Sequence, residues 1–242
     1  MNEPLQLRVI ARIHSDFATK FGIPRQSGLV DALRAEIVFE PEYRVPDALR
    51  GLEGYSHLWL IWEFSQARRP DGRWSATVRP PRLGGNTRMG VFATRSPFRP
   101  NPLGLSCVRL EGIRRDPLLG CVVQIAGADL MDGTPIYDIK PYLPYADSRP
   151  GARGGFADTA APRALEVEFP ARWLEQVPAD KRAALLGVLA GDPRPSYQQD
   201  PQRVYGFAFA GLEVRFCVDG TVLTVCSVAP AAPHDPQPQA GE

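Results

Sequence analysis

Short runs of β-branched and aromatic residues, separated by turn-forming residues, recur through the first half of this 242-residue chain. Such runs are typical of strands, and their spacing favours a closed or strongly curved antiparallel sheet. The expected strands are Leu5–Ile13, Ala35–Phe39, Ser56–Phe64, Met89–Thr94, Leu105–Ile113 and Gly120–Ala128. One short helix is expected over Pro46–Leu52, because proline suits the first position of a helix.

The chain changes character after Pro150. Residues 151–162 are rich in Gly and Ala, which predicts a linker between a first domain, residues 1–150, and a second, residues 163–229. The proline-rich and polar residues 230–242 predict a disordered tail.

The second domain is expected to be a small α+β unit. A strand is predicted over Glu166–Phe169 and a helix over Pro178–Leu189, which again begins with proline. Three more strands are expected between residues 204 and 228, with Asp219-Gly220 as a tight hairpin turn. The chain as a whole is therefore predicted to be mainly β.

Composition restricts the class of protein. No stretch of about 18 apolar residues occurs, and the N-terminus lacks the basic start and apolar run of a signal peptide, so we expect a cytoplasmic protein with no membrane span. No metal site is expected, since the three histidines form no HExxH or clustered pattern. The cysteines form no CxxC pair and are expected to be buried thiols inside strands: Cys107, Cys121, Cys217 and Cys226.

Charge is distributed unevenly along the chain. Residues 1–155 carry 21 Lys and Arg against 16 Asp and Glu, whereas residues 156–242 carry 7 against 11. The excess is concentrated in an arginine-rich segment in which Asp71 is the only acid: Arg68, Arg69, Arg73, Arg79, Arg82, Arg88, Arg95 and Arg99. Arginine binds phosphate bidentately and stacks on bases, which favours an RNA or nucleotide surface, with a solvated basic face as the alternative.

Prolines stiffen the end of this segment. Three prolines in six residues fix φ and remove backbone donors, so the stretch Arg95–Leu105 can be neither a helix nor a central strand. A stiff loop holds its arginine and asparagine side chains in place, which suits a polar, anionic or nucleotide-like ligand. A rigid surface turn with solvated arginines is the alternative.

A row of polar residues alternates with apolar ones near the end of the first domain. In an extended segment Asp138, Lys140 and Tyr142 lie two residues apart and project from one face. Such a row can hold a polar substrate, and an ion-paired sheet surface is the alternative. Two other features are interpreted as structural rather than functional: Phe21–Gly28 is an ordinary loop when taken alone, and His57 is a core histidine rather than a catalyst.

Four sequence blocks together resemble the TsaA-like proteins of the TrmO family: PRQSGLV, GLEGYSHLWLIWEF, VRPPRLGGNTRMGVFATRSPFRPNPLGLS and DGTPIYDIKPYLPYADS. They occur in order within residues 5–150, and residues 160–230 are similar to the smaller C-terminal domain of bacterial members. The resemblance implies a tRNA adenine N6-methyltransferase that binds S-adenosylmethionine in an antiparallel β-barrel and not in a Rossmann sheet. It also implies a homodimer whose substrate is threonylcarbamoyl-adenosine beside the anticodon of tRNA. The absence of a GxGxxG motif after a strand agrees with a non-Rossmann site.

The same resemblance implies which residues line the S-adenosylmethionine pocket. Arg25 or Arg95 would bind the methionine carboxylate, and the family pattern at Ser65 can carry a histidine. The implied pocket residues are Pro24, Arg25, Gln26, Ser65, Gln66, Arg95, Leu105, Asp132, Gly133, Thr134 and Pro135.

Methyl transfer to N6 requires alignment of the nitrogen and the methyl carbon at about 3 to 3.5 Å, and a group that raises the electron density on N6 by hydrogen bonding, or takes its proton, should help. Asp138 is the catalytic candidate for that group, Lys140 for pairing with the threonine carboxylate, and Tyr142 for packing on or bonding to the base. A non-catalytic RNA-binding β-barrel that uses no methyl donor is the alternative function. A nucleotide-binding hydrolase is less favoured, because the chain has no P-loop or nucleophile–base signature.

Overall fold

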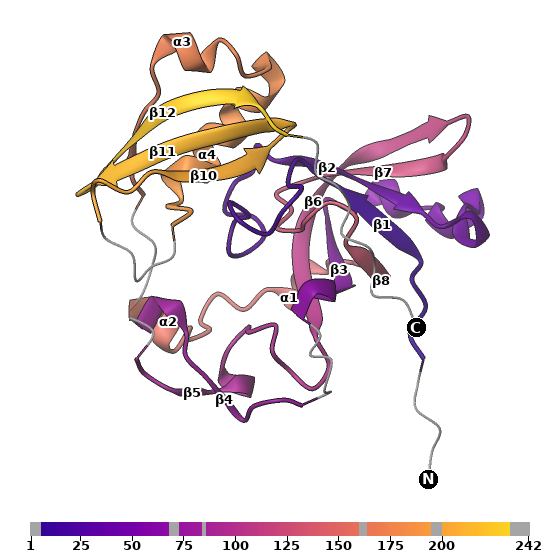
Figure 1. Ribbon diagram of the computed structural model, residues 1–242. Coiled ribbons are helices and arrows are strands. Elements are labelled where there is room, and N and C mark those ends of the chain that lie inside the picture. Colours follow the sequence, from indigo (N-terminus) through magenta and orange to yellow (C-terminus); the bar gives the residue numbers. More distant parts are fainter. Residues whose placement is uncertain (1–5, 68–72, 84–85, 160–163, 195–199, 233–242) are drawn as a thin grey trace.

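Six antiparallel strands in the first half of the chain form one closed sheet (Figure 1). The computed structural model describes residues 6–67, 73–83, 86–159, 164–194 and 200–232. The strands are β1 (Ala11–His14), β2 (Arg34–Phe39), β3 (His57–Glu63), β6 (Leu103–Asp116), β7 (Gly120–Ala126) and β8 (Pro135–Pro141). They pair in the order β1-β2-β7-β6-β3-β8, and the barrel closes because β1 pairs with both β2 and β8.

Alternation along the strands fills the barrel. In β3, Leu58 and Leu60 are fully buried and Trp62 nearly so, whereas Trp59 and Ile61 lie on the opposite, outer face. The inward side chains of all six strands form one apolar cluster. The alternation along each strand sequence therefore corresponds to inward and outward side chains of the barrel.

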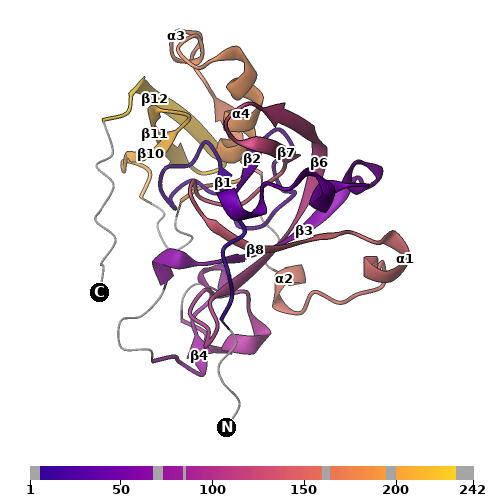
Figure 2. The same cartoon turned by 90° about the vertical axis from the view of Figure 1, so that its right-hand side faces the viewer.

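The second sheet lies to the upper left of the barrel in Figure 1 and has the order β10-β11-β12-β9. Strand β9 joins it in parallel, and the β11–β12 hairpin turns at Asp219-Gly220, where Gly220 has φ 57°. Its elements are β9 (Glu166–Glu168), α3 (Ala171–Leu174), α4 (Arg182–Ala190), β10 (Tyr205–Phe209), β11 (Leu212–Asp219) and β12 (Val222–Pro230). Figure 2 shows α4 against one face of this sheet, on the side that adjoins β2 and β7.

Short elements make up the remaining described chain. Strands β4 (Thr77–Val78) and β5 (Met89–Gly90) form a two-stranded sheet at the bottom of Figure 1. The other helices are α1 (Pro144–Asp147), α2 (Phe156–Thr159) and the 3-10 helices Pro41–Tyr43, Pro46–Leu49, Leu52–Gly54, Ser65–Ala67, Pro81–Leu83, Val91–Ala93 and Ala179–Lys181. Within the described ranges, no helix is long and apolar enough to cross a membrane.

The loop between β1 and β2 packs into the core of the second sheet rather than into the barrel. Phe17, Val30 and Leu33 belong to the apolar cluster built by α4 and strands β10 to β12. The rings of Phe17 and Phe209 meet edge to face at 5.4 Å, and Asp16 forms an ion pair with Lys181 at 2.8 Å. The loop thus belongs to the first domain in sequence and to the core of the second domain in space.

The mainly β prediction is confirmed, and most predicted elements are present. The strand predicted over Met89–Thr94 is wrong beyond Gly90. The chain there turns into the 3-10 helix Val91–Ala93, where Arg99 takes the carbonyls of Val91 and Thr94 as hydrogen-bond acceptors. The strand expected from Leu5 begins only at Ala11, and Leu5 itself lies outside the described residues.

Other predictions are corrected by local conformation. The helix predicted over Pro46–Leu52 is two 3-10 helices, because Gly51 between them has φ 87°. The strand predicted over Gly120–Ala128 ends at Ala126, because Gly127 has φ 74°. His57 is only half-buried, and its Nδ1 lies 3.0 Å from Ser56 Oγ, so it is not a core histidine.

The cysteines lie in strands as predicted, but burial was overestimated. Cys107, Cys121 and Cys217 are partly exposed and Cys226 is exposed. Cys217 and Cys226 occupy the face of the second sheet away from its core, with their Sγ atoms 3.7 Å apart. Other residues on that face are polar. The apolar residues next to the cysteines in the sequence are buried, but they say nothing about the burial of the cysteines themselves.

Regular secondary structure occurs at two places in the expected linker and tail. Helix α2 falls within residues 151–162, and β12 extends to Pro230, the first residue of the expected tail. Residues 160–163 and 233–242 lie outside the described ranges.

Arg114 joins two strands through carboxylates whose pKa values it lowers. It donates two hydrogen bonds to Glu36, at 2.8 and 2.7 Å, and one to Asp116 at 2.7 Å. These bonds lower the pKa of Glu36, and they lower the pKa of Asp116 to about 2 with help from the amides of Leu119 and Leu118. Depressed carboxyl pKa values stabilise the fold above the unfolded values, near 4, and this stabilisation is lost as the pH falls towards 2.

Replacement of this arginine is expected to change the pH dependence of stability. Arg114→Met should lower the midpoint of urea unfolding at neutral pH, and the difference from wild type should shrink as the pH falls from about 4 to about 2. Urea titrations across this range, followed by circular dichroism, measure it. Arg115→Met, on the same strand and exposed, is the control, and equal pH profiles for both variants would contradict the assignment.

Candidate functional site

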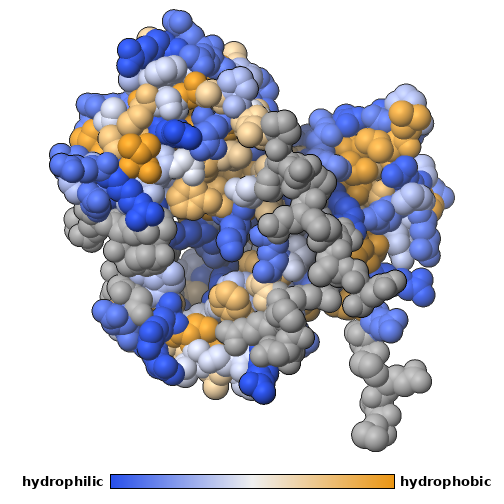
Figure 3. Space-filling view, in the orientation of Figure 1, coloured by the Kyte–Doolittle hydropathy of each residue, from blue (hydrophilic) through white to orange (hydrophobic). Residues whose placement is uncertain are grey.

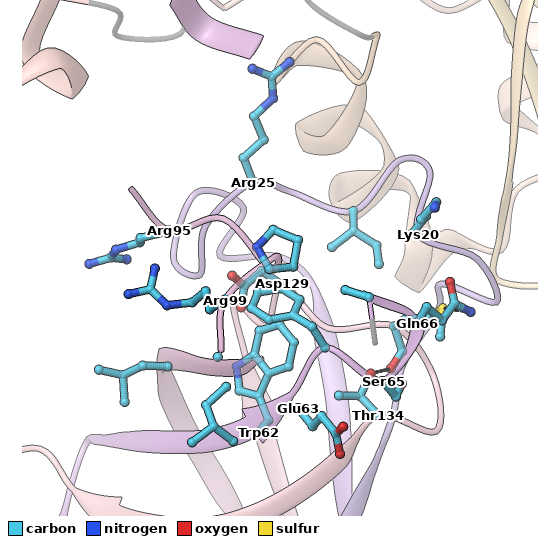
Figure 4. Close-up of a pocket in the computed structure, with 18 of the residues that line it drawn as sticks. Lys20, Arg25, Trp62, Glu63, Ser65, Gln66, Arg95, Arg99, Asp129 and Thr134 are labelled. Carbon is cyan, nitrogen blue, oxygen red and sulfur yellow. Dashed lines mark hydrogen bonds between the residues drawn. The ribbon is translucent and has the colours of Figure 1, made fainter. Parts of the chain in front are cut away.

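A cavity of about 620 Å³ opens where the β1–β2 loop faces the ends of β3 and β6 (Figure 4). Residues from four separate stretches line it, between positions 20 and 26, 62 and 67, 94 and 105, and 129 and 134. Its lining includes the rings of Trp62 and Phe64, whose centroids lie 4.2 Å apart. Segments distant in sequence therefore meet at one concave site, as in most ligand pockets.

Most of the pocket residues implied by sequence resemblance lie in this cavity. Those that line it are Pro24, Arg25, Gln26, Ser65, Gln66, Arg95, Leu105 and Thr134. Ser65 and Gln66 begin a 3-10 helix just after β3, so the end of that strand places them at the cavity. Thr134 is buried and donates its hydroxyl to the Met131 carbonyl at 2.6 Å.

Arginine side chains tie the lining loops together. Arg95 Nη1 donates a hydrogen bond to Gln26 Oε1, which joins the proline-stiffened loop to the β1–β2 loop. Arg25 Nη2 in turn donates to the carbonyl of Arg194 in the second domain at 3.1 Å. Arg99 donates to two carbonyls of its own loop at 3.2 and 2.7 Å, so it braces the loop.

Three of the implied pocket residues do not line the cavity. Asp132 accepts a hydrogen bond from the Ser15 amide at 3.0 Å and lies 3.4 Å from His14 Nδ1, at a separate polar depression. Gly133 has φ 73°, and Pro135 is buried at the start of β8. This turn positions Thr134 instead of contributing its own side chains to the cavity.

The candidate row on β8 lies on the outer face of the barrel. Asp138 and Lys140 form an ion pair at 2.9 Å, so they do share a face, and both are about half-exposed. The Tyr142 ring lies 5.9 Å from Trp59 and 6.1 Å from His57. None of the three candidates lines the cavity.

Sequence reasoning missed a hydrogen-bonded chain at the base of the cavity. Trp62 Nε1 donates to Ser106 Oγ at 2.9 Å, and Ser106 Oγ donates to Asp129 Oδ1 at 2.6 Å. Burial raises the pKa of the Asp129 carboxyl, against the opposing effect of the Ser106 hydrogen bond. The available signal was Ser106 itself, a polar residue at an inward position of β6 between buried Gly104 and Val108.

The arginine-rich segment lies partly outside the described ranges, which exclude Arg68 and Arg69. Of its other members, Arg73, Arg79 and Arg88 are exposed. Trp74 and Phe92 of the same segment are also exposed, with ring centroids 6.0 Å apart. Figure 3 shows the surface hollowed, with hydrophilic residues inside, between the second sheet and the β4–β5 segment.

Gly22 of the cavity loop lies close to the Phe207 ring of the second domain. Its φ is 92°, and a Cβ placed there would lie 2.4 Å from the Phe207 ring. Gly22→Ala is expected to lower the free energy of unfolding by about 2 to 4 kcal/mol, the combined cost of left-handed strain and overpacking. Urea unfolding measures this change.

Gly28 provides the matched control for Gly22. Its φ is 75°, but a Cβ there meets nothing within 4 Å. Gly28→Ala should therefore show only the strain, about 1 to 2 kcal/mol. Equal losses in the two variants would show that the contact with Phe207 is not tight.

The comparisons with known proteins agree on one family. Residues 12–148 match the tRNA-methyltransferase O N-terminal domain, and residues 162–231 match the TrmO C-terminal domain. The tRNA (adenine(37)-N6)-methyltransferase of Escherichia coli K12 is 41% identical over 235 residues, which cover 93% of this chain and 98% of that protein. The enzyme of the same name from Eikenella corrodens is 46% identical over 170 residues, 68% of this chain and 92% of its own.

Solved structures give the same result for the fold. The crystal structure of TrmO from Pseudomonas aeruginosa superposes with a TM-score of 0.75 at 35% identity, over 94% of this chain and 100% of that one. Sequence and fold thus agree over both domains, and the chain belongs to the TrmO family of tRNA methyltransferases.

Proposed function

We propose that this protein methylates N6 of threonylcarbamoyl-adenosine beside the anticodon of tRNA, with S-adenosylmethionine as the methyl donor. The coarser activity follows from family membership: the chain is an S-adenosylmethionine-dependent tRNA adenine N6-methyltransferase. The observation that supports the proposal most is the meeting of four sequence segments at one cavity. The threonylcarbamoyl group and the assignment of individual residues are the proposed parts.

The cavity residues fit S-adenosylmethionine. A volume of about 620 Å³ is within the usual range for small-molecule sites. Arg25 and Arg95 offer cations for the methionine carboxylate, and Gln26 and Gln66 offer amides for polar groups of the nucleoside. Trp62 offers an apolar surface for the rest of the ligand.

The protein groups chiefly orient the reactants. The donor, when bound, supplies a methyl group on a positively charged sulfur, and transfer forms a bond from N6 to carbon while the carbon–sulfur bond breaks and its electron pair stays on sulfur. We propose that Asp138 accepts the N6 proton, that Lys140 pairs with the threonine carboxylate, and that Tyr142 packs on the base.

Strand register supports a substrate site beside the cavity. Ile61 of β3 pairs with Leu105 of β6 on one side and with Asp138 of β8 on the other. Adjacent strands lie about 4.8 Å apart, so Leu105 at the cavity and Asp138 are separated by roughly 10 Å across one face of the sheet. A substrate lying on this outer face can reach both the cavity and the Asp138 row.

We also propose that the enzyme is a cytoplasmic homodimer in which residues 1–150 carry the chemistry and residues 163–229 support it. Leu105 is an apolar side chain that is 54% exposed next to the cavity, which suits coverage by a second copy. Light scattering coupled to size-exclusion chromatography tests the oligomeric state, and a monomer at micromolar concentration would contradict this part.

The central experiment uses tRNA that already carries threonylcarbamoyl-adenosine. The purified protein is incubated with this tRNA and S-adenosylmethionine, and the nucleosides are analysed by mass spectrometry. A methylated product is expected, with the methyl group on N6. Product only on tRNA that lacks the threonylcarbamoyl group, or no product on fully modified tRNA, would overturn the substrate assignment.

A further inference from the structure

Asp129 is an acidic side chain at the centre of a cavity with a cationic rim. Figure 4 shows it between Arg25 on one side and Trp62 on the other. Arg95 and Arg99 also line the cavity. The arginines can therefore bind an anionic part of a ligand. The central carboxylate would repel such a group, so it must have another function.

Neutral donors hold the Asp129 carboxylate in place. Ser106 Oγ donates to Oδ1 at 2.6 Å and is itself fixed by Trp62 Nε1 at 2.9 Å. The Ser27 amide is a further donor. Burial dominates the environment of this carboxyl and raises its pKa, while the attraction of Arg95 is the weakest of the influences that lower it.

Such a carboxylate favours a positive charge in the cavity. A charge held by neutral hydrogen-bond donors is positioned but not cancelled, and its attraction for a cation is stronger in a partly apolar cavity than in water. Glu63, the other cavity carboxylate, differs because it is almost fully buried and accepts a hydrogen bond from the Tyr137 hydroxyl. Asp129 is thus the better placed of the two for contact with a ligand.

The donor and its product differ in charge at one atom. Methyl transfer breaks the carbon–sulfur bond and leaves its electron pair on sulfur, so S-adenosylmethionine is cationic at sulfur and S-adenosylhomocysteine is neutral there. We propose that Asp129 is a specificity-determining residue that favours the cationic donor over the neutral product. This inference rests on the proposed use of S-adenosylmethionine in this cavity.

Kinetics distinguish a role of Asp129 in donor specificity from a purely structural role. The positive charge leaves sulfur as the methyl group moves, so Asp129 stabilises the bound donor more than the transition state. Loss of the charge is therefore expected to raise the KM for the donor without a comparable fall in kcat. Loss of a merely structural group would lower kcat and the affinity for both ligands.

Calorimetry with two ligands tests the inference. Asp129→Asn should lower the affinity for S-adenosylmethionine at least about tenfold and change that for S-adenosylhomocysteine less than about threefold. Asp47→Asn removes the same charge from an exposed position and should change neither affinity. Asp129→Glu, which keeps the charge, should restore part of the preference.

The outcomes are distinguishable. Equal losses for both ligands, or no loss for either, would overturn the specificity assignment. Asp129→Ser is a second neutral variant, and whichever of the two keeps the near-UV circular dichroism of wild type is used for the comparison. A wild-type protein that binds neither ligand would instead contradict the proposed function.

Discussion

Asp138→Asn is expected to lower the rate of tRNA methylation about 100-fold, the usual lower bound for loss of a general base, with the affinity for S-adenosylmethionine unchanged. The affinity should survive because Asp138 lies on the outer face of β8 and does not line the cavity. The rate should fall because asparagine keeps the shape of the side chain but cannot take the N6 proton. Single-turnover assays on threonylcarbamoylated tRNA, with nucleosides quantified by mass spectrometry, measure the rate.

Lys140 is the internal comparison for Asp138, because the two side chains form one ion pair. Lys140→Ala should raise the KM for tRNA, since it removes the cation proposed for the threonine carboxylate, and it should leave the donor affinity intact. If both variants kept wild-type turnover with normal donor binding, the row would be an ordinary ion-paired surface and the base would lie elsewhere.

Arg95→Ala is expected to lower the affinity for S-adenosylmethionine about 10- to 100-fold. A hydrogen bond to a charged group contributes about 1.5 to 3 kcal/mol, and each 1.4 kcal/mol is a tenfold change. Arg95 also donates to Gln26, so its loss releases the contact between two lining loops. Isothermal titration calorimetry measures the affinity directly.

Controls separate charge from loop support. Arg50→Ala, at an exposed ion pair that does not line the cavity, should leave the affinity unchanged. Gln26→Ala keeps the Arg95 cation but removes its acceptor, and it should cause a smaller loss than Arg95→Ala. Wild-type affinity in a folded Arg95→Ala protein would assign the methionine carboxylate to another cation of the cavity.

Periodicity predicted the strands of this fold but not the neighbours of its loops. The alternation in β3 is strong enough to identify both the strand and its inward face, from Leu58 to Trp62. No comparable signal shows that Phe17 packs with Phe209, because an apolar loop residue has no period and its partner lies far along the chain. The 3-10 helix at Val91–Ala93 was missed for a related reason, since its stabilising group, Arg99, comes from the following loop.

The candidate site was predicted mostly from resemblance, and the structure adds what resemblance did not provide. Arg95 and Gln26 come from separate sequence blocks, and only the fold shows that they are hydrogen-bonded. Asp129 was missed because an aspartate next to a turn is usually solvated, and its hydrogen-bond partner Ser106 lies on β6, 23 residues earlier in the chain. Asp132 is the opposite case. Its sequence block was identified as part of the site, but its side chain lines a polar depression separate from the cavity.

The packing of the β1–β2 loop against the second sheet also affects how the protein is made. Phe17 leaves the ribosome early, but its partner Phe209 is synthesised only after every strand of the barrel, the last of which ends at Pro141. Domains generally fold as units during synthesis, so a nascent chain can close its barrel while the loop that carries Arg25 and Gln26 still lacks its apolar anchor. Donor binding at the proposed cavity is then acquired last, and a chain released before β10 would be a folded barrel whose cavity loop lacks its apolar anchor.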